Sequence, residues 1–106
     1  MGVAETLRKH PILGFLDRVC IQDYQLPDVS GKGTVTLKAG TSVYIPLLGI
    51  QNDPELYSDP DNFDPERFTE ENKKKRPAFT FFPFGEGPRM CIGENYSIHI
   101  IAVIHY

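Results

Sequence analysis

The sequence has few of the features by which several classes of protein are recognised. It contains no Trp and only two cysteines, Cys20 and Cys91, too few for the disulfide framework of a small secreted domain. Their surroundings differ, which indicates a reduced compartment and separate roles. A net charge of −3 argues against a nucleic-acid partner, because a nucleic-acid binder needs a basic surface. No apolar run reaches the roughly 18–20 residues that span a bilayer, and no signal peptide follows Met1.

The residues that are present are typical of a small globular protein with long loops. The length of 106 residues suits one small domain, and a hydrophobic fraction of 41% is ordinary. Nine Pro and nine Gly are many for this length, so long stretches are expected to be loop and turn. We therefore expect little regular structure with which to bury a self-sufficient core.

The order of helix-forming and β-branched residues predicts short helices and strands. Good helix formers over residues 4–10 predict a helix that stops at Pro11, and the β-branched stretch 12–21 predicts extended chain. Residues 34–37 and 42–45 flank a Gly-containing turn, which predicts a hairpin of two strands. The remaining expectations are one helical turn over 47–50, irregular chain over 52–68 and a helix after Gly93.

The chain has one run of like charges, three Lys and one Arg at residues 73–76. Such a run is typical of a solvated surface, so residues 72–77 are expected to form an exposed loop. A docking contact with an acidic partner is the alternative.

Residues 84–93 have the residue types expected of a ligand-binding site. Gly87 and Gly93 flank Cys91, as is needed where the backbone turns tightly or a flat group approaches it. Cys91 stands just before a predicted helix, whose N-terminal N–H groups and dipole favour a thiolate. Arg89 has the fork geometry that pairs with a carboxylate, and Phe84 can cover the sulfur side. A stabilised thiolate, an anion-pairing Arg and room for a flat group together describe the proximal loop of a haem site.

Residues 84–93 resemble the cytochrome P450 signature, Phe-x-x-Gly-x-Arg-x-Cys-x-Gly, at every fixed position. A chance match is expected on the order of once in millions of windows. The resemblance implies a haem b cofactor whose iron is held by Cys91. The residues implied in haem binding are Cys91, Arg89, Phe84, Gly87 and Gly93. Cys20 lacks this setting and is expected to be a buried, inert thiol.

Two further motifs agree with this family in order and distance. Residues 5–8, Glu-Thr-Leu-Arg, resemble its Glu-x-x-Arg helix, and the i, i+3 spacing places both charges on one face. Residues 65–68, Pro-Glu-Arg-Phe, resemble its downstream Arg motif. The resemblance implies that Glu5, Arg8 and Arg67 form a buried network that supports the haem and is structural, not catalytic.

The chain between these motifs carries two weaker matches. Arg18 stands where many members place another Arg that binds a haem propionate; an ordinary surface ion pair is the alternative. Ile12, Leu13, Gly14 and Phe15 resemble the strand that lines the substrate pocket above the haem; core packing is the alternative.

The fold that this resemblance implies is α+β. Residues 1–106 are expected to be a partial domain, the C-terminal portion of the mainly α cytochrome P450 fold, truncated at both ends. The implied parts are the Glu-x-x-Arg helix over 1–10, a β region over 12–50, a meander over 52–83, the Cys-ligand loop over 84–93 and the start of the next helix over 94–106.

The sequence around the motifs is similar to that of arthropod microsomal members. The resemblance implies a haem-thiolate monooxygenase that inserts one oxygen atom from O₂ into a lipophilic small molecule, with electrons from NADPH through NADPH–cytochrome P450 reductase. The implied location is the cytosolic face of the endoplasmic reticulum membrane, with the membrane anchor in a segment outside this sequence. Two alternatives stay open, a non-oxygenase isomerase or dehydratase with the same thiolate haem, and an inactive truncated product.

The sequence departs from the family pattern in three ways. The oxygen-activating helix with its acid–Thr pair is not in the sequence. Gln51 stands where relatives usually carry His. Residues 94–97, Glu-Asn-Tyr-Ser, replace a segment that usually has a basic residue, Phe and a small residue. The last change puts in doubt the packing of the helix below the haem and the charge that faces the reductase.

Overall fold

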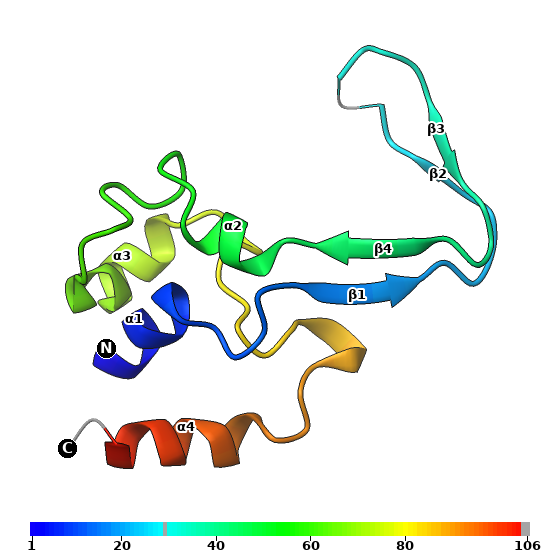
Figure 1. Ribbon diagram of the computed structural model, residues 1–106. Helices are drawn as coiled ribbons and strands as arrows, with labels where there is room; N and C mark the ends of the chain where they lie inside the picture. Colours follow the sequence, from blue (N-terminus) through cyan, green and yellow to red (C-terminus); the bar gives the residue numbers. More distant parts are fainter. Residues whose placement is uncertain (29, 105–106) are drawn as a thin grey trace. The chain divides into compact units, whose positions relative to one another are not determined.

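A computed structural model describes residues 1–28 and 30–104 (Figure 1). Residues 105 and 106, which end the segment predicted as the last helix, lie outside the described residues. The chain divides into two compact units, residues 1–14 with the chain from Pro46 onward, and Phe15–Ile45. The helices belong to the first unit and the strands to the second, which is consistent with the expected α+β class.

The unit Phe15–Ile45 contains two antiparallel strand pairs (Figure 1). β1 (Leu16–Val19) pairs with β4 (Ser42–Ile45), and β2 (Tyr24–Leu26) pairs with β3 (Val35–Leu37). Each pair is a two-stranded sheet, so β1 and β4 bring the two ends of this unit together.

The predicted hairpin between residues 34–37 and 42–45 is wrong, because β3 and β4 do not pair with each other. The turn at Gly40 is present, with φ of 89°. However, the Gly40 N–H donates to the carbonyl of Cys20 (2.7 Å), and the Cys20 N–H donates to the carbonyl of Thr41 (2.9 Å). These bonds join the turn to the chain after β1, so β4 continues along β1 instead of folding back on β3.

Most side chains of this unit are exposed. Phe15 and Tyr44 pack edge to face, with ring centroids 5.5 Å apart. Cys20 was expected to be buried but is half-buried, and its Sγ donates to the carbonyl of Gln22 (3.1 Å). The expectation of full burial fails because the side chains of β1 and β4 are themselves exposed or half-buried, so this strand pair offers no buried position nearby among the described residues.

The first unit holds the helices. The helices predicted before Pro11 and after Gly93 and the turn predicted over 47–50 are observed as α1, α4 and α2. Residues 12–15, which resemble a family strand, lie before β1 and are not part of it. The bounds are Gly2–Lys9 for α1, Leu47–Gln51 for α2, Pro65–Phe68 for the 3₁₀ helix η1, Glu70–Lys75 for α3, Gly87–Arg89 for the 3₁₀ helix η2 and Glu94–Ile104 for α4.

The loop predicted over residues 72–77 is wrong, because most of it belongs to α3. The Thr69 hydroxyl caps the helix by accepting from the backbone N–H of Asn72 (3.4 Å). Ion pairs from Glu70 and Glu71 to lysines three and four residues later then offset the charge run. The run is solvated as expected, but its helix depends on acidic residues that lie before it.

The core of the first unit is small and contains charge. The buried apolar side chains among the described residues are Leu7, Leu47, Tyr57, Phe68, Phe82 and Phe84. Three of the four largest fully buried side chains are polar or charged, namely Glu5, Arg8 and Gln51. Because buried charges are costly unless they are paired, the packing here depends on how these groups satisfy one another.

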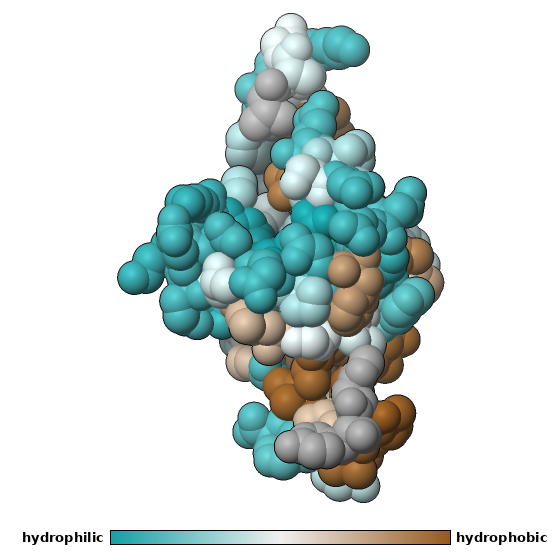
Figure 2. Space-filling model, turned by 90° about the vertical axis from the view of Figure 1, so that its left-hand side faces the viewer, coloured by the Kyte–Doolittle hydropathy of each residue, from teal (hydrophilic) through white to brown (hydrophobic). Residues whose placement is uncertain are grey.

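Helix α4 carries apolar side chains that the described chain leaves exposed. Tyr96, Val103 and Ile104 are each about three-quarters exposed. Figure 2 shows hydrophobic surface, in brown, gathered at the bottom of the view, at the level of α4 in Figure 1. Within residues 1–28 and 30–104, no helix has the length and apolar character needed to cross a bilayer.

Candidate functional site

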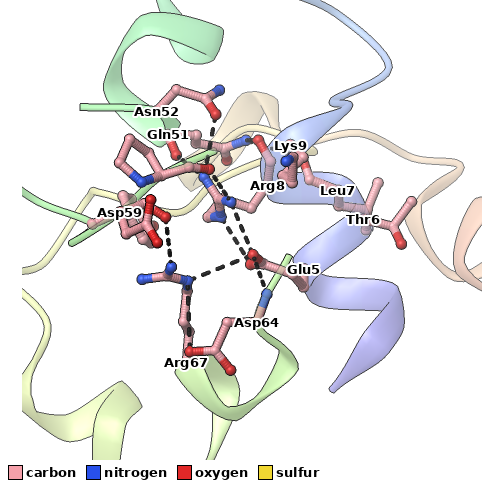
Figure 3. A network of polar contacts seen from close by, with 12 residues as sticks. Glu5, Thr6, Leu7, Arg8, Lys9, Gln51, Asn52, Asp59, Asp64 and Arg67 are labelled. Carbon is pink, nitrogen blue, oxygen red and sulfur yellow. Dashed lines mark hydrogen bonds and ion pairs between the residues drawn. The ribbon is translucent and has the colours of Figure 1, made fainter. Parts of the chain in front are cut away.

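Glu5 and Arg8 form a fully buried ion pair on one face of α1 (Figure 3). Arg8 Nε donates to Glu5 Oε2 and Arg8 Nη2 to Glu5 Oε1, both at 2.8 Å. The i, i+3 spacing allows this approach, and the two parallel bonds match the fork of the guanidinium. The pair that the sequence indicated is thus present, and neither side chain is accessible to solvent.

The remaining hydrogen bonds of Arg8 reach residues far away in the sequence. Arg8 Nη1 donates to the carbonyl of Gln51 (2.9 Å) and to Asn52 Oδ1 (3.2 Å), and Nη2 donates to the carbonyl of Pro60 (2.7 Å). One guanidinium therefore ties α1 to the end of α2 and to the irregular chain before η1.

Arg67, in η1, completes the contacts around Glu5 (Figure 3). Its Nε lies 3.6 Å from Glu5 Oε1, and its Nη2 donates to the carbonyl of Asp59 (2.8 Å). The backbone N–H of Asp64 also donates to Glu5 Oε1 (3.1 Å). The structure thus brings together all three members of the predicted network, Glu5, Arg8 and Arg67, with the carboxylate at the centre.

The surroundings of Glu5 favour its charged form. Burial by itself would raise the pKa of Glu5, but the hydrogen bonds from Arg8 and Asp64 and the charges of Arg8 and Arg67 together hold it below its ordinary value. The carboxylate is therefore ionised, and both guanidinium groups have a counter-charge.

Gln51 belongs to this network, although the sequence marks it only as a departure from the family pattern. It is fully buried, and its Nε2 donates to the carbonyls of Leu7 (3.0 Å) and Arg8 (3.1 Å) at the end of α1. Among the described residues nothing donates to its Oε1. Its amide therefore caps the end of α1, where carbonyls lack intrahelical donors.

The loop of Cys91 is closed by backbone hydrogen bonds. The N–H of Cys91 donates to the carbonyl of Phe84 (2.7 Å), and the N–H of Gly85 donates to the carbonyl of Phe82 (2.9 Å). Gly85 and Gly87 have φ of 80° and 79°, a region in which a side chain is strained. Glycine is therefore required for the chain to return to Phe84 before α4 begins.

The side chains of this loop are arranged with the apolar residue inside and the sulfur outside. Phe84 is buried at 8% exposed, whereas Cys91 is an exposed free thiol and Ile92 is fully exposed. A Cβ on Gly93 would lie 3.8 Å from the Cys91 sulfur, so glycine leaves the space beside it open. An accessible sulfur with a cleared flank fits a flat group that coordinates through its metal.

The other predicted site residues lie at exposed positions. Arg89 is exposed in η2. Arg18 is exposed in β1, in the other unit, and its Nη1 donates to the carbonyl of Asp17 (2.7 Å). Ile12, Leu13 and Phe15 are each more than half exposed, so the core-packing alternative for them is not met within the described chain. Their roles toward a cofactor or substrate remain predictions.

The motifs and their geometry agree with the relatives of this chain. The family profile for cytochrome P450 matches residues 1–104. The chain belongs to the cytochrome P450 family. It is 48% identical over 107 residues to Cytochrome P450 6k1 of Blattella germanica, covering 99% of this chain and 20% of that protein. It is also 50% identical over 95 residues to Probable cytochrome P450 6a13 of Drosophila melanogaster, covering 90% of this chain and 18% of that protein.

The expected similarity to arthropod members is thus confirmed by insect relatives. The chain spans about a fifth of the length of the curated relatives that it matches. The experiments below use a hybrid protein in which this chain replaces the matching part of Cytochrome P450 6k1. We call this hybrid the full-length chimera.

Acidification is expected to remove the stabilisation that Glu5 provides. Because the pKa of Glu5 is below its ordinary value of 4.5 in the folded chain, the stabilisation is fully present above pH 4.5. It is lost as the pH falls through the lower, folded-state pKa. In the full-length chimera, Glu5→Gln should therefore destabilise most at neutral pH and progressively less below pH 4.5. Urea unfolding at a series of pH values measures the difference; a difference independent of pH would contradict this cause.

Proposed function

We propose that this chain is the haem-thiolate part of a cytochrome P450 monooxygenase, in which Cys91 would bind the iron of haem b through its sulfur. The observation that carries the proposal is the exposed sulfur of Cys91 in a closed loop that has every fixed residue of the family signature. When bound, haem supplies the chemistry by which one oxygen atom of O₂ enters a lipophilic small molecule.

In this proposal the residues of the loop bind and orient the cofactor. Cys91 would hold the haem iron through its sulfur and would donate electron density to it. Arg89 would pair with one haem propionate, and Arg18 is the candidate for another. Gly87 and Gly93 allow the flat group to approach, and Phe84 excludes water from the inner side of the loop.

The remaining residues act at a distance from the iron. Glu5, Arg8 and Arg67 are structural, because they join α1, the end of α2 and η1 into one buried network. Ile12, Leu13, Gly14 and Phe15 are proposed to line the substrate pocket, and the exposure of the three apolar side chains leaves them available for that contact.

The family supports two further assignments. Electrons would come from NADPH through NADPH–cytochrome P450 reductase, and the protein would act at the cytosolic face of the endoplasmic reticulum membrane. Reconstituting the full-length chimera with that reductase tests the first assignment. NADPH-dependent product that needs the reductase supports it, and no product despite a stable thiolate-type ferrous–CO band would count against it. For this chain's own protein, the transcript upstream of Met1 decides between the monooxygenase and the isomerase or dehydratase, because an oxygenase needs the acid–Thr pair.

The chain without the rest of a cytochrome P450 is expected to hold haem poorly. Six buried apolar side chains form the core of the first unit among the described residues, and the Cys91 loop lies at its surface. Expressed with haem, the 106-residue chain should give no lasting ferrous–CO band of thiolate ligation, whereas the full-length chimera should give one. A strong, stable band from the chain alone would show that this core suffices.

A further inference from the structure

Tyr57 occupies a buried position between two arginines. It is 3% exposed, and the guanidinium carbons of Arg8 and Arg76 each lie 5.3 Å from its ring centroid. Both distances are within the range of cation–π attraction. Its hydroxyl donates to the carbonyl of Thr80 (2.9 Å), and burial raises the pKa of Tyr57, so the hydroxyl keeps the proton that it donates. Tyr57 therefore links the Glu5 network to a second group of residues.

Arg76 holds that second group together. Its guanidinium carbon lies 4.4 Å from the ring centroid of Phe68 and 5.8 Å from that of Phe81, and these two rings pack with centroids 4.7 Å apart. Its Nη2 donates to the carbonyl of Arg67 (2.7 Å). Arg76 thus contacts three aromatic rings and the backbone of the arginine that faces Glu5.

The segment that these contacts hold is strained and leads directly to the cysteine loop. Phe79 has φ of 59°, a left-handed conformation that is costly for a bulky side chain, and its side chain is 72% exposed. The backbone carbonyl of the next residue, Thr80, accepts the hydrogen bond from the Tyr57 hydroxyl, and the Thr80 hydroxyl donates to the carbonyl of Pro77 (2.9 Å). Such a conformation persists only where neighbouring contacts hold it. Here the Tyr57 hydroxyl donates to the carbonyl of Thr80, and the Arg76 guanidinium faces the ring of Phe81.

We propose that Tyr57 and Arg76 are positioning residues for the Cys91 thiolate. They fix the chain at residues 77–81, which is followed directly by Phe82. The hydrogen bonds from Gly85 to the carbonyl of Phe82 and from Cys91 to the carbonyl of Phe84 then set the position of Cys91 relative to that chain. The proposal rests on the proposed haem-thiolate function and extends it to two residues that do not touch the cofactor.

The test compares variants of the full-length chimera by the lifetime of the thiolate-type ferrous–CO band at a fixed temperature, with far-UV circular dichroism recorded in parallel. Tyr57→Phe keeps the ring but removes the bond to Thr80, and Arg76→Gln removes the cation. Each is expected to shorten the lifetime by about tenfold while the helical signal is unchanged, in line with residues that support a metal ligand from outside. Arg76→Lys keeps the charge, so the lifetime of its ferrous–CO band should lie between those of Arg76→Gln and the parent.

Two further variants distinguish a positioning role of Tyr57 and Arg76 from a general effect on the stability of the fold. Phe79→Gly removes the left-handed strain, so in the Tyr57→Phe background it should restore much of the lost lifetime of the ferrous–CO band. Lys74→Gln removes an equal charge from an exposed position of α3 and should behave as the parent.

The possible results are distinct. Parent-like lifetimes in Tyr57→Phe and Arg76→Gln, or a band lost only together with the helical signal, would overturn the positioning role. A parent chimera that gives no thiolate-type band would instead overturn the haem-thiolate function of Cys91.

Discussion

Replacing Cys91 with Ser in the full-length chimera is expected to abolish the thiolate-type ferrous–CO band and to reduce turnover to background. A serine hydroxyl is not ionised at neutral pH and is a harder ligand than a thiolate, so it cannot supply the electron density that this haem chemistry needs. The side chain is exposed, so the substitution should leave the fold intact. Absorption spectroscopy and product formation in the same preparation measure the two effects.

Cys20→Ser is the matched control. Cys20 is the other free cysteine of the chain, and its Sγ donates to a backbone carbonyl, a bond that a serine hydroxyl can also make. This variant should keep both the band and the turnover of the parent. If Cys91→Ser were indistinguishable from Cys20→Ser in both measurements, Cys91 would not be the ligand.

Replacing Arg8 with Met is expected to destabilise the full-length chimera by roughly 3–5 kcal/mol, because it leaves the Glu5 carboxylate buried with its main counter-charge removed. Three backbone or side-chain oxygens, on Gln51, Asn52 and Pro60, lose a donor as well. Equilibrium urea unfolding gives the free-energy difference. If the variant does not accumulate, a lower yield of folded protein than that of the parent shows that the substitution is destabilising.

A double variant tests whether the loss comes from the unpaired charge. Glu5→Gln with Arg8→Met removes both charges, so its cost should be less than the sum of the two single costs. Lys38→Met is the surface control, since the Lys38–Asp23 pair is as short, 2.7 Å, but both of its side chains are more than half exposed. That substitution should have little measurable effect. Additive costs for Glu5 and Arg8 would mean that the two residues act independently.

The Glu5 network and the Tyr57–Arg76 contacts share one residue, Arg8. Arg8 contacts both Glu5 and Tyr57, so one guanidinium takes part in the ion pair and in the aromatic contacts. Changes at Arg8 should therefore affect the loop of Cys91 as well as the fold. Because Arg8 is shared, its effects should be non-additive with those of Tyr57.

Some features followed from local patterns in the sequence. Pro11 ends α1 because a residue before proline avoids the helical region, and Glu5 and Arg8 share a face because they are three residues apart. The family followed from the types and spacing of the residues around Cys91, and the comparison with known proteins confirmed it. These inferences depend only on residues that lie close together in the sequence, three residues apart for Glu5 and Arg8 and within ten residues for the segment 84–93.

Only the tertiary structure decided which distant groups meet. The pairing of β4 with β1 depends on hydrogen bonds between Cys20 and the turn at Gly40, about twenty residues apart, and a local alternation pattern cannot distinguish that pairing from a hairpin. Likewise, nothing near Tyr57 in the sequence indicates that Arg8 and Arg76 lie against its ring. Burial creates these contacts, because charges removed from water must find partners wherever the folded chain supplies them.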